Sequence, residues 1–408
     1  MSLLVQKFGG TSVDGPERIR SVAARVAAAR AAGDDTVVVV SAMGQTTDEL
    51  LALAHAVSHD PYPRELDMLL TAGERVTMAL LAIALRDIGV DAISFTGSQS
   101  GILTDGTHRA ARITAIKPER IRQELARGHV VIVAGFQGVN PETREITTLG
   151  RGGSDTTAVA LVAALGPGRC EIFTDVSGVY TADPRVAPGA RVIPKLSYRM
   201  CSTLAHLGAK VLHARCVDLA AAHRVPFSVR SSFDDSPGTR IEEDDMEESG
   251  VRAVIHRGGC SIVVAEGTAG GRGEARGIIA AVAEAHPELE LIAHEQNTDA
   301  HGAIVWAGAR EEAEALERNF RTLRGPGGEW KLGVDHGAAF VSVAGLGLGA
   351  REAVRAETAL ERAGVPLVAL RSTPTALIFR VPDETCDAAV RALHAEFLEP
   401  GPGAAARG

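Results

Sequence analysis

The hydrophobic positions of residues 1–233 follow two alternating patterns. Short runs rich in Val and Ile, typical of strands buried on both faces, are separated by longer segments with apolar residues at helical spacing. This alternation predicts an α/β fold in which a mainly parallel sheet lies between two layers of helices, a three-layer αβα arrangement. We expect strands at 3–8, 36–40, 130–134, 171–174 and 226–229, helices at 17–32, 48–55, 65–85, 156–165 and 202–222, and a hairpin or turn at 140–148.

A different order of elements is predicted for the second half of the chain. Residues 234–250 are acidic and contain Gly and Pro, which favours a linker. Residues 251–399 then show the order βαββα twice, which predicts two small α+β modules packed together, and residues 400–408 form a Gly/Ala-rich tail expected to be disordered. The expected strands are 252–256, 260–265, 289–295, 303–307, 338–344, 366–371 and 375–380, and the expected helices are 274–285, 310–319, 350–363 and 385–397.

Composition limits the class of protein. The net charge of -9 over 408 residues argues against nucleic-acid binding, which needs clustered positive charge. No run of about 18 apolar residues is present and the N-terminus lacks a signal-peptide pattern, so we expect a cytoplasmic protein without a membrane partner. The five cysteines are widely scattered, which predicts buried, reduced thiols and no metal site.

Lysine is rare in this chain. Only five lysines occur among 42 basic residues, so Arg has replaced Lys almost everywhere. A lysine that remains in such a chain is expected where a compact point charge is required. Two of the five, Lys7 and Lys210, fall inside the motifs described next.

The first motif is Lys7-Phe8-Gly9-Gly10-Thr11-Ser12, between the first strand and the first helix. Glycines at such a place let backbone N–H groups approach a phosphate, and a lysine can reach the transferred phosphoryl oxygens. The motif is not a Walker A loop, because no GxxxxGK[ST] sequence occurs in the chain. Taken alone, the motif fits a plain turn with a capping Thr or Ser as well as it fits a phosphate-binding loop.

Two further segments favour a ligand crevice over a plain turn. Residues 148–157 (TLGRGGSDTT) offer a second Gly-rich turn with an Arg and an Asp, and residues 173–185 (FTDVSGVYTADPR) follow a strand with further Asp and Arg side chains and a Tyr suited to stacking on a base. Three such segments at the carboxyl ends of strands in one α/β domain are typical of a ligand-binding crevice.

With these motifs in hand, the chain resembles the aspartokinases of the amino-acid-kinase family. The resemblance covers the whole first domain, so residues 1–233 are interpreted as an amino-acid-kinase catalytic domain. The matching segments are 7–12, 37–51 (VVVVSAMGQTTDELL), 70–75 (LTAGER), 96–105 (TGSQSGILTD), 130–140 (VVIVAGFQGVN), 147–161, 174–185 and 207–215 (LGAKVLHAR).

The resemblance implies a role for individual residues. It implies that Lys7 stabilises the transferred phosphoryl group, with Asp155 and Arg151 also catalytic. The acceptor amino acid would be held by Ser41, Thr47, Glu74, Arg151 and Ser154, and the nucleotide side would be lined by Lys7, Gly9, Gly10, Asp155, Thr174, Asp175, Tyr180, Asp183, Arg185, Lys210 and Val211.

The implied reaction is ATP-dependent phosphorylation of L-aspartate to 4-phospho-L-aspartate, the first step towards Lys, Met and Thr. The nucleophile is a carboxylate that is already ionised at pH 7, so no general base is required. Alignment and charge neutralisation, with Mg²⁺ on the phosphate oxygens, would supply the catalysis. The alternative to an acceptor-binding role for Glu74 is that its side chain is a solvent-exposed charge on a helix surface.

The second half resembles the tandem ACT domains of aspartokinases, with altered turns. Residues 268–274 (TAGGRGE) and 345–349 (GLGLG) stand where ligand-binding turns are expected. ACT pairs bind amino-acid effectors, commonly across a subunit interface, so a homo-oligomer is expected and feedback by lysine or threonine is either kept, relaxed, lost or retuned. Met246 is considered as an internal start of a separate regulatory subunit.

Two other functions stay open on the sequence alone. One is a specialised pathway paralogue with lost or altered feedback, acting on aspartate or a related amino acid, since residues 199–205 (RMCSTLA) replace a stretch that is acidic in aspartokinases. The other is a non-catalytic amino-acid sensor, against which the presence of Lys7, Arg151 and Asp155 speaks.

Overall fold

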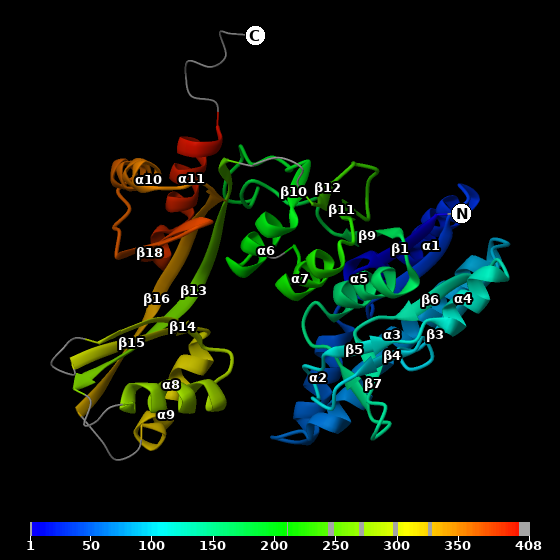
Figure 1. Ribbon diagram of the computed structural model, residues 1–408, viewed down its shortest axis with the longest axis horizontal. Coiled ribbons are helices and arrows are strands. Elements are labelled where there is room, and N and C mark those ends of the chain that lie inside the picture. The colour runs from blue at the N-terminus through cyan, green and yellow to red at the C-terminus, as the bar shows by residue number, and fades with distance from the viewer. Residues whose placement is uncertain are drawn as a thin grey trace, which may run out of the picture. The chain divides into compact units, whose positions relative to one another are not determined.

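The computed structural model describes residues 2–209, 211–243, 249–268, 273–296, 301–324 and 329–399 (Figure 1). The chain divides into two compact units, one formed by Met1–Tyr180 and Arg191–Glu248 and the other by Thr181–Ala190 and Ser249–Gly408. The division differs from the predicted boundaries in two places. Residues 181–190 group with the second unit, and residues 234–243 with the first. Residues 244–248 of the predicted linker, Met246 included, and the tail 400–408 lie outside the described residues.

An eight-stranded sheet forms the centre of the first unit. Its order is β10-β12-β11-β9-β1-β2-β6-β3, and the strands from β11 to β3 run parallel. The central Val and Ile side chains are buried, as expected for strands covered on both faces. The strands are β1 (Leu3–Phe8), β2 (Asp35–Val40), β3 (Ala92–Phe95), β6 (Val130–Ala134), β9 (Gly168–Thr174), β10 (Lys195–Ser197), β11 (Phe227–Ser231) and β12 (Thr239–Glu242).

Helices cover both faces of this sheet. Because side chains alternate along a strand, Phe8 and Lys7 of β1 face opposite sides. Phe8 packs in one core with residues of α1 and α3, whereas Lys7 faces α5. The α/β prediction with a mainly parallel sheet is therefore confirmed. The helices of this unit are α1 (Pro16–Ala31), α2 (Thr46–Val57), α3 (Pro63–Asp87), α4 (Glu119–Ala126), α5 (Gly153–Leu165), α6 (Tyr198–His206) and α7 (Ala214–His223), with a short 3-10 turn at Gly10–Val13.

One predicted helix of this unit is wrong. The apolar pattern of 202–222 predicts a single helix, but the structure has α6 and α7 with a break between them. Gly208 adopts φ +103°, which helical backbone does not allow. The Ser197 hydroxyl caps α6 by accepting from the Met200 N–H, and the His213 ring caps α7 by accepting from the Arg215 N–H. Sequence periodicity continues across the break, which is why it misled the prediction.

A small four-stranded sheet, β5-β4-β7-β8, accompanies the first unit. The predicted hairpin or turn at 140–148 contains the connection 140–145 of the β7–β8 hairpin and strand β8 itself. In the connection, the Asn140 side chain accepts from the backbone N–H groups of Glu142 and Thr143. The hairpin ends directly before the Gly-rich segment of residues 150–153. The strands are β4 (Ile102–Thr104), β5 (Ile113–Ile116), β7 (Gln137–Val139) and β8 (Ile146–Thr148).

The second unit is built on one six-stranded antiparallel sheet, β14-β15-β13-β16-β18-β17. The two predicted βαββα modules are present, but they share two long strands. Segments 252–256 and 260–265, predicted as separate strands, are halves of β13, with a bulge at Gly258–Gly259. The elements are β13 (Gly250–Thr268), α8 (Glu274–Ala285), β14 (Glu290–Gln296), β15 (His301–Gly308), α9 (Arg310–Leu323), β16 (Glu329–Leu346), α10 (Ala350–Arg362), β17 (Ala369–Thr373), β18 (Ala376–Pro382) and α11 (Cys386–Leu398).

Two features of the composition can be placed in the structure. All five cysteines are buried and unpaired, as predicted. Among the described helices, α3 alone is long and apolar enough to cross a membrane. It packs Leu81 and Leu85 into the sheet core and carries the buried acids Asp67 and Glu74, so part of its apolar surface serves the core of the first unit, whereas Val76, Leu80 and Ile83 are exposed.

Candidate active site

Lys7 and Asp155 form an ion pair between the central strand and the first turn of α5. The Lys7 Nζ lies 2.6 Å from the Asp155 Oδ1, and the two side chains are only 11% and 12% exposed. The strand-then-glycine pattern brings them together, because β1 ends at Phe8 and α5 begins after Gly152, which adopts φ +67°. Placed at a helix N-terminus, the carboxylate also benefits from the helix dipole. The pair fixes an ammonium group at the carboxyl edge of the sheet.

The turn after β1 is closely packed against the turn after β2. A Cβ on Gly10 would lie 3.0 Å from the Ala42 carbonyl oxygen, and the Gly44 N–H donates to the Gly10 carbonyl at 3.1 Å. Gly9 is similarly close, since a Cβ there would lie 3.4 Å from the Lys7 Nζ. The glycines of the first motif therefore allow two strand ends and the lysine to occupy one small region.

Glu74 lies on α3 against the turn that follows β2. Its side chain is buried, the Oε1 accepts from the Ala42 N–H at 3.2 Å, and the Oε2 has no hydrogen-bond partner among the described residues. Burial raises its pKa to about 7. The preceding Gly73 permits this contact, because a Cβ there would lie 2.6 Å from the Ala42 Cβ. The alternative of a solvated helix charge is thus wrong for Glu74.

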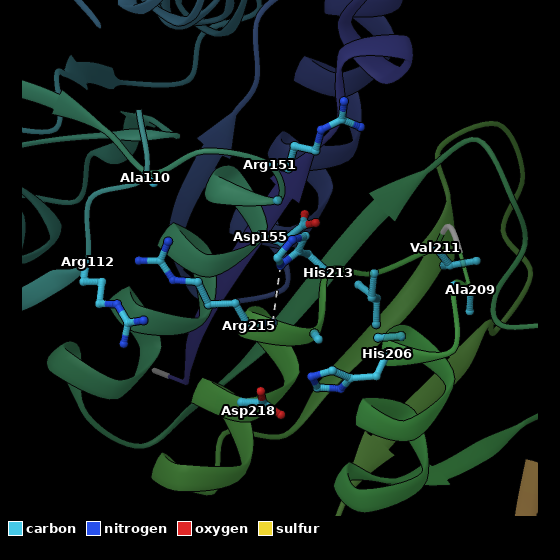
Figure 2. Close-up of a pocket in the computed structure, with 15 residues that line it drawn as sticks. Ala110, Arg112, Arg151, Asp155, His206, Ala209, Val211, His213, Arg215 and Asp218 are labelled. Carbon is cyan, nitrogen blue, oxygen red and sulfur yellow. Dashed lines mark hydrogen bonds between the residues drawn. The ribbon is translucent and has the colours of Figure 1, made fainter. Parts of the chain in front are cut away.

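A cavity of about 1130 Å³ lies between the Gly-rich turn and the start of α7. Asp155 of the ion pair and Val211, which is predicted for the nucleotide side, both line it, whereas Lys7 is not among its lining residues. The turn and α7 are in direct contact, since a Cβ on Gly152 would lie 2.3 Å from the Cβ of His213. The further lining residues are Ala110, Arg112, Arg151, Gly152, Ala205, His206, Gly208, Ala209, Leu212, His213, Ala214, Arg215 and Asp218 (Figure 2).

The remaining residues predicted for the acceptor side follow strands or begin helices, except Arg151, which lies in the Gly-rich turn. Ser41 directly follows β2, and Thr47 is in the first turn of α2. Ser154 is buried beside the end of β6, where a Cβ on Gly135 would lie 2.7 Å from its hydroxyl. Arg151 is exposed, and in Figure 2 its guanidinium points away from those of Arg112 and Arg215.

The residues predicted for the nucleotide side belong to two different units. Thr174 and Asp175 follow β9, with the Thr174 hydroxyl donating to the Asp175 carboxylate at 3.1 Å, and Tyr180 forms an isolated bridge with Val192. Asp183 and Arg185 belong to the second unit. There they pair with each other at 2.7 Å, and the pairing lowers the pKa of Asp183. Lys210 lies outside the described residues.

Sequence reasoning missed several residues that line the cavity. Arg112, His206 and Asp218 have no motif that announces them, although Arg215 lies inside the segment 207–215. Arg215 donates from Nη1 to the Leu149 carbonyl at 2.9 Å and from Nη2 to the Ala111 carbonyl at 2.7 Å. Such bonds to backbone carbonyl groups leave no signature in a sequence.

Comparison with known proteins agrees with this architecture. A model of the amino acid kinase family matches residues 2–231. An aspartokinase of Corynebacterium glutamicum is 43% identical over 405 residues, which cover 97% of this chain and 96% of that protein. Among solved structures, E. coli aspartokinase III in complex with aspartate and ADP, in the R-state, has a TM-score of 0.81 at 24% identity and covers 97% of this chain and 100% of that chain.

The same E. coli enzyme in complex with lysine and aspartate, in the T-state, has a TM-score of 0.75 at 25% identity and covers 97% of this chain and 100% of that chain. Taken with the family model, these likenesses identify the class: the chain belongs to the amino acid kinase family. Within that family its relatives over nearly the full chain place it among the aspartokinases. The resemblance drawn from the motifs is confirmed, and the protein is a kinase.

Proposed function

We propose that the cavity beside Lys7 and Asp155 transfers the γ-phosphoryl group of ATP to the side-chain carboxylate of L-aspartate, giving 4-phospho-L-aspartate and ADP. One observation carries the proposal. A buried lysine–aspartate pair lies between two glycine turns at the carboxyl edge of a parallel sheet, in a chain whose relatives over nearly its whole length are aspartokinases. This favours an aspartate kinase over the specialised paralogue and over a non-catalytic sensor.

Positioning and charge neutralisation account for the chemistry. The acceptor carboxylate is ionised at neutral pH and attacks without a general base. The Lys7 ammonium neutralises the charge that develops on the transferred phosphoryl oxygens, and Asp155 holds that ammonium in place at 2.6 Å. Because both side chains are largely buried, their interaction is screened little by water.

Glu74 and Arg151 would recognise the two groups of the amino acid that do not react, the α-ammonium group and the α-carboxylate. The free, buried Oε2 of Glu74 suits an α-ammonium group, whose charge would lower the pKa of this carboxyl and ionise it. Arg151 suits the α-carboxylate, since a guanidinium donates two parallel hydrogen bonds. The hydroxyls of Ser41, Thr47 and Ser154 would complete the acceptor side.

The nucleotide would lie along Gly9, Gly10, Thr174, Asp175, Tyr180 and Val211. Contacts with Lys210, Asp183 and Arg185 stay predictions, because Lys210 lies outside the described residues and the other two belong to the second unit. Mg²⁺ is commonly held by one or two carboxylates together with phosphate oxygens. No group of three or more His, Cys, Asp or Glu side chains fits a metal ion within the described part of the chain. A magnesium ion bound by the nucleotide phosphate oxygens and by the single carboxylate of Asp175 would need no such group. It would neutralise phosphate charge.

The direct test is phosphoryl transfer by the purified protein. With ATP and magnesium, we expect ADP release that depends on aspartate, and an acyl phosphate that hydroxylamine traps as the hydroxamate. Glutamate and succinate serve as comparison acceptors, the first with one more methylene group and the second without the ammonium group. Absence of hydroxamate from aspartate would reject the proposed function.

Regulation by an amino acid is proposed for the second unit. The T-state structure of E. coli aspartokinase III contains lysine, and its chain is matched over its full length, which supports an amino-acid effector here. Of the two turns expected to differ, the first contains residues 269–272, which lie outside the described residues. In the second, Gly349 is the N-cap of α10, and its N–H donates to the Glu352 carboxylate at 2.8 Å. Assays with lysine and threonine, singly and together, distinguish kept feedback from lost feedback. The homo-oligomer and the cytoplasmic location stay predictions.

A further inference from the structure

Two backbone segments, residues 108–111 and 148–150, lie side by side directly before Arg151. The Ala111 N–H donates to the Thr148 carbonyl at 2.9 Å. Gly150 adopts φ +75°, and a Cβ there would lie 2.8 Å from the Arg109 carbonyl oxygen. The contact is therefore backbone against backbone, and a shift of the first segment moves the second. Since Arg151 is the next residue in the chain, these two segments determine where its side chain starts.

Arg215 joins the two segments from the side of α7. Its fork of N–H groups donates to the Leu149 carbonyl at 2.9 Å and to the Ala111 carbonyl at 2.7 Å. It forms no ion pair with a carboxylate of the described residues. Burial, with the neighbouring Arg112 charge, lowers the pKa of this guanidinium. The rigid guanidinium fork is preorganised to donate to carbonyl groups of two segments at once, whereas a lysine ammonium on a flexible stem is not.

Asp67 joins the same two segments from the side of α3. Its carboxylate is fully buried and accepts the Thr148 hydroxyl at 2.6 Å in one segment, and the His108 Nδ1 at 2.6 Å and the Arg109 N–H at 3.2 Å in the other. A buried carboxylate with hydrogen bonds to two segments is costly to disturb, because each partner would lose its bond inside the protein.

We propose that Arg215 and Asp67 are positioning residues, which together hold segments 108–111 and 148–150 so that Arg151 is presented to the acceptor amino acid. This inference rests on the proposed function in taking Arg151 as an acceptor-binding residue. Neither residue needs to touch the acceptor. The competing interpretation is that Arg215, which lines the cavity, binds an anionic ligand by its charge.

The substitutions Arg215→Met, Arg215→Lys and Asp67→Asn test the proposal. Arg122→Met is a matched control, because Arg122 also donates to two backbone carbonyls, those of Ala164 and Leu165 at 2.9 and 3.1 Å, but at the other end of α5. We expect both Arg215 variants and Asp67→Asn to raise the KM for aspartate by about 10-fold or more, as misplaced binding groups do, with less than about a threefold change in the KM for ATP.

Native-state cleavage by trypsin gives a readout that is independent of activity. In the absence of substrates, loosened segments are expected to be cut after Arg109, Arg112 or Arg151 about 10-fold faster in the Arg215 and Asp67 variants, and at the wild-type rate in the Arg122 variant. Both residues hold the same segments, so the double variant should show less than the sum of the two single effects.

Three results would overturn the positioning role. They are a KM for aspartate within twofold of the wild type in Arg215→Met, a raised KM with unchanged cleavage, and full rescue by Arg215→Lys. The last two would assign Arg215 to direct ligand binding by its charge. If the wild-type protein phosphorylates no aspartate, the proposed function fails, and the cleavage rates alone decide whether Arg215 and Asp67 hold the two segments.

Discussion

Lys7 at the end of β1 and Asp155 in the first turn of α5 are joined by a 2.6 Å ion pair whose members are both nearly excluded from solvent. Residues 148 positions apart in the chain therefore form one charged unit at the carboxyl edge of the sheet. Under the proposed function, Asp155 orients the Lys7 ammonium for the transferred phosphoryl group.

Lys7→Met should lower turnover by about 10²–10³ or more, because it removes a preorganised charge from the transferred phosphoryl group. It should also destabilise the protein by about 3–5 kcal/mol, since Asp155 is left as an unpaired buried charge. The double variant Lys7→Met with Asp155→Asn separates the two effects. Its free energy of unfolding should recover towards the wild-type value while activity stays lost, and recovered activity would contradict the assignment of Lys7.

Glu74→Gln should raise the stability of the protein at pH 8 and abolish tight aspartate binding. The pKa of Glu74 rises from 4.5 to about 7 on folding, so the folded protein holds this proton more tightly than the unfolded chain. Its contribution to stability consequently falls as pH rises between those two values, by about 3 kcal/mol in total. Denaturant unfolding at pH 5 and pH 8 measures this. The stability advantage of the Gln variant should be present at pH 8 and largely gone at pH 5.

The same group predicts how binding depends on pH. Because the ionised form of Glu74 would bind the ammonium group, the affinity of the wild-type protein for aspartate should decrease as pH falls below about 7. In Glu74→Gln the affinity should be weak and nearly independent of pH over that range. Equal pH profiles for the two proteins would remove Glu74 from the acceptor side.

Gly152→Ala should reduce both stability and activity. The residue adopts φ +67°, and a Cβ would lie 2.3 Å from the His213 Cβ, so the start of α7 must move away from the Gly-rich turn. Gly89→Ala is the matched control, because Gly89 also has a positive φ of +80° but no atom within 4 Å of the added Cβ. The control should lose about 1–2 kcal/mol from backbone strain alone and keep its kinetic constants. Equal loss of activity in both variants would show that the contact with α7 is unimportant.

His394→Ala should destabilise the packing of residues 181–190 in the second unit. The buried His394 ring bonds through Nε2 to the Thr181 hydroxyl at 2.9 Å and through Nδ1 to Glu399 at 3.0 Å. Losing these bonds and the ring volume should cost about 2–4 kcal/mol, whereas Thr181→Val, which removes one bond at similar volume, should cost about 1 kcal/mol. Unfolding curves, together with the rate of trypsin cleavage after the exposed Arg185, measure the loss of stability in both variants. A loss in His394→Ala no greater than in Thr181→Val would contradict this account.

Much of the fold could be predicted because it depends on local patterns. The Val-rich runs identify β2 and β6 as strands buried on both faces, and Gly9-Gly10 after a strand identifies one of the turns beside the ion pair. The break between α6 and α7 was missed, because the apolar spacing continues through residues 207–213. The sharing of β13 by two modules was also missed, since Gly258 and Gly259 interrupt the pattern at the bulge.

Contacts made through the backbone account for what the sequence does not reveal at the site. Arg215 binds backbone carbonyl groups, and Asp67 binds a backbone N–H together with the Thr148 hydroxyl and the His108 ring, so their partners are set by the tertiary fold. Likewise, residues 173–185 appear as one continuous motif, yet residues 181–185 belong to the other unit. Residue types predict which chemistry is available, whereas the fold decides which of those groups share a site.

The most direct test of the account follows oxygen from the acceptor to phosphate. L-Aspartate carrying ¹⁸O only in its side-chain carboxylate is incubated with the protein, magnesium and ATP, and the acyl phosphate is examined by ³¹P NMR. The account predicts an isotope-shifted phosphorus signal from a P–¹⁸O bond, because the carboxylate beside Lys7 attacks the γ-phosphorus. An acyl phosphate without that shift, or no acyl phosphate at all, would contradict it.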